Sequence, residues 1–214
     1  TGAHYNWASK VLHVPAYSVR DDATQDHVLA WRGLLDHECA HVEFSDFQVY
    51  DAAIAKWREE EGEKQAPRLM MIANVFEDIL IERLWIGLNP GAAKHLDATN
   101  RVVIAETGGA GPCDPTFVTK AGLITAVCQA ILRTAGGRVT RDECPDEVVA
   151  VLDLLEDEIT ESTTTQTSAD VIRITESAWE KLKDMTGRNE DEDDGSDEGD
   201  NAGDNSEGDE EDGG

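Results

Sequence analysis

The pentapeptide His37-Glu38-Cys39-Ala40-His41 contains the residue types and the spacing of a metal-dependent hydrolytic site. Residues four apart in an α-helix lie on one face, so His37 and His41 would present two imidazoles to one point. Imidazole nitrogen binds Zn²⁺ at about 2.0–2.1 Å. Zinc lowers the pKa of a bound water to around 7, and Glu38, at the margin of that face, can then take its proton. We therefore predict zinc ligands at His37 and His41 and a catalytic base at Glu38.

A catalytic zinc site needs a third protein ligand, and the stretch from Asn74 to Asp78 supplies candidates. Asn74, Glu77 and Asp78 fall on one face of a helix, and acidic groups in so apolar a stretch are costly to bury unless they are paired or bind metal. We favour Glu77 as the third ligand, with Asp78 accepting a hydrogen bond from the free N–H of a ligating histidine and Asn74 in support. The reverse order, with Asp78 on the ion, stays open.

The same residues could also have purely structural roles, without a metal. His37 and His41 would then be partly buried histidines that pair with acidic neighbours, and Glu77 and Asp78 would cap or bridge helices in a bundle.

Three further groups of residues are weaker candidates for the site. Glu82 and Arg83 are expected to form a surface ion pair, a lone His95 is expected to be structural, and Tyr17 and Tyr50 are both candidates to stabilise an oxyanion.

Helices must position these residues, and the apolar pattern predicts them along most of the chain. Apolar residues recur at helical spacing over residues 25–42, 51–62, 67–88, 92–106, 116–134, 146–158 and 168–185. One short extended segment is expected within residues 9–17, a loop at 107–115 and a polar linker at 160–167. The predicted fold class is mainly α, with at most a small N-terminal β element.

The C-terminal segment has a different composition from the rest of the chain. From residue 186 onward it holds 14 acidic residues against a single basic one, Arg188, and no aromatic or branched aliphatic residue. Such a segment cannot bury enough apolar area to offset the entropy of ordering, so we expect a disordered acidic tail. The predicted organisation is a metal-binding domain over residues 1–160, a linker and helix over 161–185 and the tail over 186–214.

Charge and composition exclude several classes of function. The chain carries a formal net charge of −27, about half of it outside the tail, which argues against binding to nucleic acid or to an anionic membrane. No apolar run approaches the length of a membrane span, and the N-terminus lacks the pattern of a signal peptide. The four cysteines are widely spaced and form no CxxC pair. We expect a cytoplasmic protein.

Two motifs together carry a resemblance to a known family. The first is the Asp36-His37-Glu38 helix that leads to Ser45-Asp46-Phe47, and the second is the N-x-x-E-D-x-x-I-E pattern from Asn74, which ends in the turn at Asn89-Pro90-Gly91. Over about residues 10 to 105 the chain resembles bacterial and phage proteins related to the cobaltochelatase subunit CobT. These join an HExxH-containing helical domain to a von Willebrand factor A domain, often through a long acidic segment.

The resemblance implies a zincin-like metallopeptidase domain of the gluzincin type, with a glutamate on a helix as third zinc ligand. It also implies a peptide or protein substrate, a missing von Willebrand factor A domain, and a MoxR-type AAA+ ATPase as partner in a bacterial or phage-infected cell. Two functions follow as hypotheses. One is a zinc-dependent peptidase, and the other is a non-catalytic, zinc-stabilised interaction module between an A domain and an ATPase.

Overall fold

The computed structural model describes residues 4–6, 9, 11–13, 24–106, 122–135 and 141–186. The contacts divide the chain into two compact units, Thr1–Lys181 and Leu182–Gly214, and the site discussed below belongs to the first. The loop predicted at 107–115, the start of the helix predicted at 116–134, Tyr17 and the acidic tail from residue 187 lie outside the described residues.

Eight α-helices account for most of the described residues, which confirms the mainly α class. They are α1 (Gln25–Phe44), α2 (Phe47–Glu60), α3 (Ala66–Leu88), α4 (Ala92–Glu106), α6 (Leu123–Ala135), α7 (Asp146–Leu154), α8 (Glu156–Ser162) and α9 (Ser168–Thr186), with a short 3₁₀ turn at Arg141–Glu143. None of the described helices combines the length and the apolar character needed to cross a membrane.

The small β element is a two-stranded hairpin near the N-terminus. Strand β1 (His4–Asn6) pairs antiparallel with β2 (Val11–His13), and His4 lies opposite His13. The extended segment expected within residues 9–17 corresponds to β2. Its partner β1 was not predicted, because three residues are too few to show an alternating pattern.

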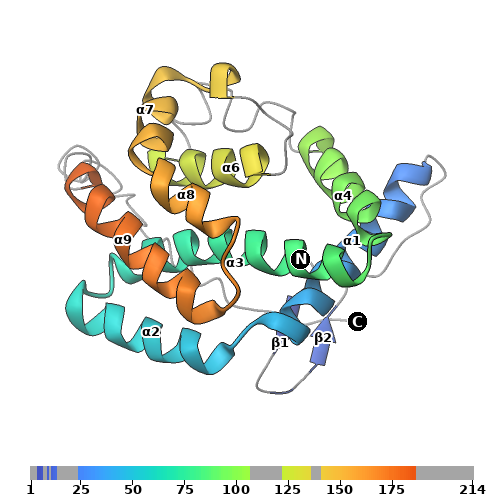
Figure 1. The fold of residues 1–214 in the computed structure, drawn as a ribbon, viewed down its shortest axis with the longest axis horizontal. Coiled ribbons are helices and arrows are strands. Elements are labelled where there is room, and N and C mark those ends of the chain that lie inside the picture. The colour runs from blue at the N-terminus through green and yellow to red at the C-terminus, as the bar shows by residue number, and fades with distance from the viewer. Residues whose placement is uncertain are drawn as a thin grey trace, which may run out of the picture. The chain divides into compact units, whose positions relative to one another are not determined.

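Helix α3 runs through the middle of the helical array, with α2 below it and α6 above it, while α9 slants down past α3 towards α2 (Figure 1). Its apolar residues are buried along most of its length, and Pro67 occupies its first turn, where the missing N–H leaves no hydrogen bond unmade. The largest buried apolar side chains come from α3 itself, from α2, α6, α7 and α9, and from Leu155 between α7 and α8: Trp57, Leu69, Ile72, Phe76, Leu80, Ile81, Ile131, Leu152, Leu155, Ile174 and Trp179. This core holds α3 rigidly, which matters because α3 carries the predicted carboxylates.

Helices α1 and α4 approach so closely that one position in α1 has room only for glycine. A Cβ atom on Gly33 would lie 2.1 Å from Oγ1 of Thr99 and 2.3 Å from the carbonyl oxygen of His95. Thr99 on α4 also forms a hydrogen bond to α1, since its hydroxyl donates to the carbonyl oxygen of Ala30 at 2.8 Å. This packing fixes the half of α1 that precedes the histidines.

Two helix boundaries differ from those predicted. Helix α2 begins at Phe47 instead of residue 51, because Oδ1 of Asp46 accepts hydrogen bonds from the backbone N–H groups of Gln48 and Val49. The helix predicted over 146–158 is broken at the buried residue Leu155 into α7 and α8. The acidic first turn of α8 suits a helix start, since negative charge is favourable there.

Helix α9 packs against α2 and α3 and is not a detached element after a linker. Glu176 accepts hydrogen bonds from Nε1 of Trp57 at 3.1 Å and from Nζ of Lys56 at 2.8 Å. Ser168, the first residue of α9, donates to Glu77 at 2.9 Å. The first compact unit includes this helix as far as Lys181.

Candidate metal centre

The structure brings His37, His41 and Asp78 together. The two histidines lie one turn apart on α1, with ring centroids 4.8 Å apart, and Asp78 faces them from α3. Oδ1 of Asp78 lies 3.7 Å from Nε2 of His37 and 3.4 Å from Nε2 of His41. One ligand atom from each residue lies within 4.8 Å of the others, so the three form a group that could hold a metal ion.

Two of the donor–donor distances in this group suit a tetrahedral ion. Oδ1 of Asp78 is buried and has no hydrogen-bond partner among the described residues, which is costly for a carboxylate oxygen. Ligand atoms about 2.0–2.1 Å from a tetrahedral zinc lie about 3.3 Å from one another. The two measured oxygen–nitrogen distances are close to that value, so an ion between them would satisfy the isolated oxygen with little movement.

Glu82 fixes the ring of His37. Its Oε1 lies 3.1 Å from Nδ1 of His37, and because an ionised carboxylate only accepts, Nδ1 carries the proton. Burial lowers the pKa of His37, but the hydrogen bond to Glu82 and the charges of Asp78 and Glu82 outweigh it and raise that pKa to about 9. A bound metal ion would take the place of the proton on Nε2. The surface ion pair expected between Glu82 and Arg83 is not formed, since Arg83 donates to the carbonyl oxygen of Thr165 instead.

A hydrogen bond between Nδ1 of His41 and Oγ of Ser45, 2.9 Å long, fixes the ring of His41. The hydroxyl of Ser45 also acts on Glu77, whose pKa it lowers. Nε2 of His41 is left to face Asp78, as a metal ligand would be.

Glu77 is held by two hydroxyl groups and lies beside the metal group, not in it. Its carboxylate accepts from the hydroxyl of Tyr50 at 3.2 Å and from that of Ser168 at 2.9 Å. Burial raises the pKa of Glu77, although these bonds and the charge of His41 oppose the rise. The structure thus places Asp78 opposite the imidazoles, whereas Glu77, the favoured third ligand, is bonded to Tyr50 and Ser168.

Asn74 holds the other oxygen of Asp78. Its Nδ2 donates to Oδ2 of Asp78 at 3.2 Å, one turn further along α3. The supporting role predicted for Asn74 therefore has a specific partner. Glu38 lies outside the three-residue group, and its side chain is buried, with 7% of the residue exposed. Its charge still acts on His37, whose pKa it helps to raise.

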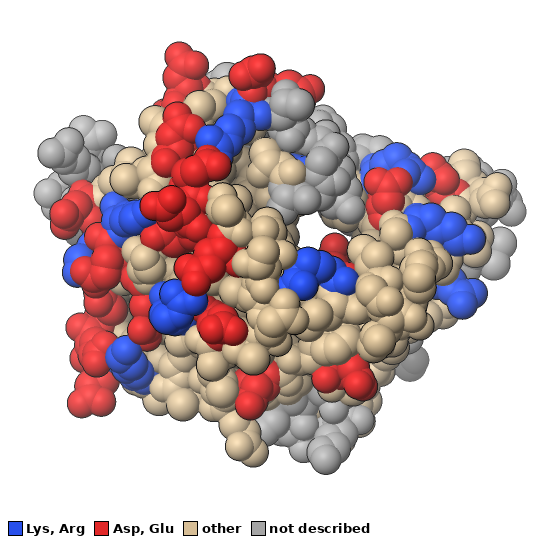
Figure 2. Space-filling view, in the orientation of Figure 1, with Lys and Arg blue, Asp and Glu red and all other residues tan. Residues whose placement is uncertain are grey.

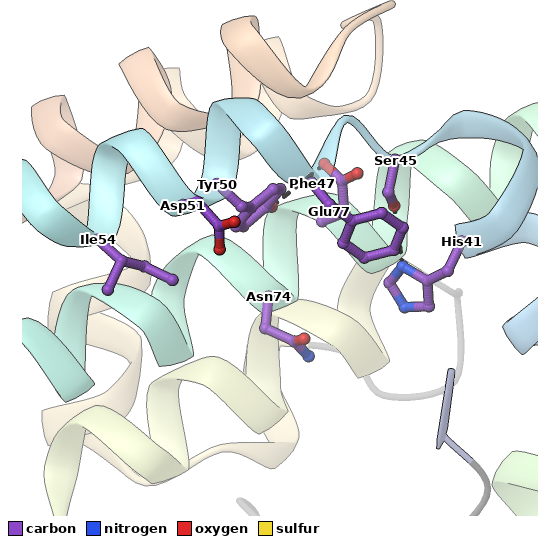
Figure 3. A pocket seen from close by; sticks show the side chains of 8 residues that line it. All are labelled: His41, Ser45, Phe47, Tyr50, Asp51, Ile54, Asn74 and Glu77. Carbon is purple, nitrogen blue, oxygen red and sulfur yellow. Dashed lines mark hydrogen bonds between the residues drawn. The ribbon is translucent and has the colours of Figure 1, made fainter. Parts of the chain in front are cut away.

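A pocket of about 190 Å³ opens beside the metal group (Figure 3). One wall is the face of α2 with residues 47, 50, 51 and 54, and the other comes from the end of α1 and from α3. The residues that line it are His41, Ser45, Phe47, Tyr50, Asp51, Ile54, Asn74 and Glu77. Tyr50 donates to the carbonyl oxygen of Ala73 as well as to Glu77, so its hydroxyl braces the pocket wall.

Some residues of the site were not predicted from the sequence, and one was assigned another partner. Ser168 had no signal in the sequence, and Ser45 appeared only within the motif of the resemblance. Glu82 was misassigned, yet it lies four residues after Asp78 and so shares its helix face. Nδ1 of His95 lies 2.7 Å from Oδ2 of Asp36, and His95 is not one of the three residues of the metal group.

Comparison of the chain with protein-family models, with curated proteins and with solved structures finds no match.

Proposed function

We propose that this chain is a zinc-dependent hydrolase of peptide bonds, in which His37, His41 and Asp78 hold the ion. The observation that carries the proposal is the buried Oδ1 of Asp78, which lacks a hydrogen bond and faces the Nε2 atoms of both histidines. Two imidazoles and one carboxylate are a donor set that suits zinc and leaves a fourth position for a substrate or water.

The surrounding residues support this chemistry. When bound, zinc would supply a Lewis acid that polarises a carbonyl and lowers the pKa of water. Glu38, next to His37 on α1, is the proposed base that removes the proton of that water. Glu82 and Ser45 hold the two imidazoles with Nε2 toward the site, and Asn74 holds Asp78. The pocket beside His41 would receive part of the substrate.

Metal content tests the ligand assignment. We expect the purified full-length chain to bind one zinc ion, and Asp78→Asn to bind it at least about 100-fold more weakly through loss of a charged ligand. Glu77→Gln is the matched control on the adjacent residue, because Gln keeps an acceptor for the hydroxyl groups of Tyr50 and Ser168. Equal zinc affinity in wild type and Asp78→Asn, or a larger loss in Glu77→Gln, would reject this assignment.

Cleavage of an unbiased peptide library tests the catalytic half. We expect wild type to cut and Glu38→Gln to lose that activity while it keeps its zinc, since Glu38 is not a ligand in this proposal. A zinc-loaded wild type that cuts no peptide would reject the peptidase.

A second candidate is the non-catalytic, zinc-stabilised module suggested by the resemblance to CobT-related proteins. The burial of Glu38 favours it, because a base must reach water. In that case zinc would raise the melting temperature and allow binding to an A domain or to a MoxR-type AAA+ ATPase, with no cleavage. A zinc-loaded wild type that cuts peptides would reject this second candidate.

A further inference from the structure

The pocket beside the metal group has a shape and a charge that select for one kind of side chain. Its volume of about 190 Å³ is below the roughly 300–1,000 Å³ of sites that enclose a drug-sized molecule, so it suits a single side chain. Phe47 and Ile54 give it apolar surface, and they lie seven residues apart on the same face of α2. A long side chain with an apolar stem would contact both.

The two carboxylates of the pocket differ in their hydrogen bonds. The carboxylate of Glu77 accepts hydrogen bonds from the hydroxyl groups of Tyr50 and Ser168. Asp51 is exposed, and no group within the described residues forms a hydrogen bond or an ion pair with its carboxylate. In Figure 3 this carboxylate lies between Ile54 and Asn74, on the pocket side of α2. The pocket thus joins apolar walls to one unpaired negative charge.

The negative net charge of the molecule also favours a cationic ligand. The formal net charge is −27, and Figure 2 shows acidic side chains gathered over the face that carries α7, α8 and α9. A potential of this sign concentrates cationic ligands near the surface and repels anionic ones. Lysine and arginine combine the two properties that the pocket requires, since each carries a cationic head on an apolar stem.

We propose that the pocket between α2 and α3 binds a lysine or arginine side chain of a peptide, next to the bond that the metal centre would cut. Phe47 and Ile54 contact the stem, and Asp51 pairs with the cationic head. This inference rests on the proposed peptidase function for the position of the cut, while binding of the cationic side chain can be tested without cleavage.

Four peptides that differ only in one residue, Lys, Arg, Leu or Glu, test the selectivity on the zinc-loaded full-length chain. We expect wild type to cut the Lys and Arg peptides with a kcat/KM at least about 10-fold above that for Leu, and Asp51→Asn to remove most of that preference, as expected for loss of a charged partner. Asp51→Lys should move the preference to Glu. Glu59→Gln, which removes one charge from α2 about 12 Å further along the axis, is the control and should keep it.

The outcomes separate this inference from the proposed function. Cleavage without a preference for Lys or Arg would overturn the inference and leave the peptidase standing. If no peptide is cut, binding of the labelled Lys peptide to zinc-loaded Glu38→Gln decides by fluorescence polarisation. If Asp51→Asn weakens the binding of this peptide about 10-fold, the result supports the binding of the cationic side chain in the pocket without supporting the peptidase. No binding, or equal binding to Asp51→Asn, overturns it.

Discussion

Asn74 donates a hydrogen bond of 3.2 Å from Nδ2 to Oδ2 of Asp78, one turn further along the same helix. The bond occupies one oxygen of the carboxylate and leaves the other, Oδ1, turned toward the two histidines. Asn74 is itself exposed and makes no part of the core. It is therefore a residue whose removal should affect the metal centre without unfolding the protein.

Asn74→Ala should weaken zinc binding by about 10-fold, because Asp78 loses the group that orients it. The dissociation constant can be measured by competition with a chromophoric chelator. Asn100→Ala is the control, since its Nδ2 donates to the carbonyl oxygen of Leu96 on α4, remote from the site. Equal zinc affinities for wild type and Asn74→Ala would contradict the role assigned to this bond.

Ser45→Ala should also weaken zinc binding, by about 10- to 100-fold, because it removes the hydroxyl group that fixes Nδ1 of His41. Ser45→Thr retains a hydroxyl group in an extended backbone conformation that threonine adopts readily, so it should bind zinc nearly as well as wild type. The same competition assay measures both variants. Equal zinc affinities for Ser45→Ala and Ser45→Thr would show that the hydrogen bond between Ser45 and His41 is not needed.

Gly33→Ala should destabilise the fold by at least about 1–3 kcal/mol, because its Cβ has no space between α1 and α4. Gly87→Ala is a matched control within a helix, where nothing lies within 4 Å of the added carbon. It should leave stability unchanged or raise it by about 0.5–1 kcal/mol. Thermal unfolding followed by circular dichroism measures both, and a similar melting temperature for the two variants would refute the close approach of α1 to α4.

Glu158→Gln should destabilise the protein at neutral pH and lose that effect in acid. Burial alone would raise the pKa of Glu158, but hydrogen bonds from Lys181 and Ser177 and the charge of Lys181 lower it overall. A carboxylate whose folded pKa is lowered stabilises the fold above its unfolded pKa, and this stability is lost as the pH falls through the folded value.

Denaturant titrations of wild type and Glu158→Gln at several pH values check this sign. The difference in unfolding free energy should be about 1 kcal/mol or more at pH 7 and should close below about pH 4. Asp157→Asn, which removes an exposed charge from the neighbouring position, should change stability by less than about 0.5 kcal/mol at every pH. A difference for Glu158→Gln that grows in acid would reverse the assigned shift.

Much of the helical framework could be predicted because its signals are local. The histidines four residues apart and the apolar pattern around Phe76 led to the same two helices that the structure contains. Boundaries depended on single capping groups, and Asp46 was taken as the end of one motif when it also begins α2. Leu155 broke a helix that the apolar pattern alone would continue.

The roles within the site could be predicted only in part, since they depend on residues remote in the sequence. Glu77 and Asp78 are adjacent and equally acidic, so spacing along α3 could not decide which faces His37 and His41. The decision comes from hydroxyl groups on α2 and α9, which occupy Glu77 and leave Asp78 for the histidines. No pattern within α3 contains that information.

The bond between Ser168 and Glu77 has a consequence for the order in which the site can form. The two residues are 91 positions apart, and the same serine hydroxyl also accepts the backbone N–H of Asp46 at the start of α2. During synthesis the histidines and both carboxylates leave the ribosome long before this serine does. The nascent chain thus carries every proposed zinc ligand while the outer hydrogen bonds are incomplete, and the centre reaches its final rigidity only when α9 docks.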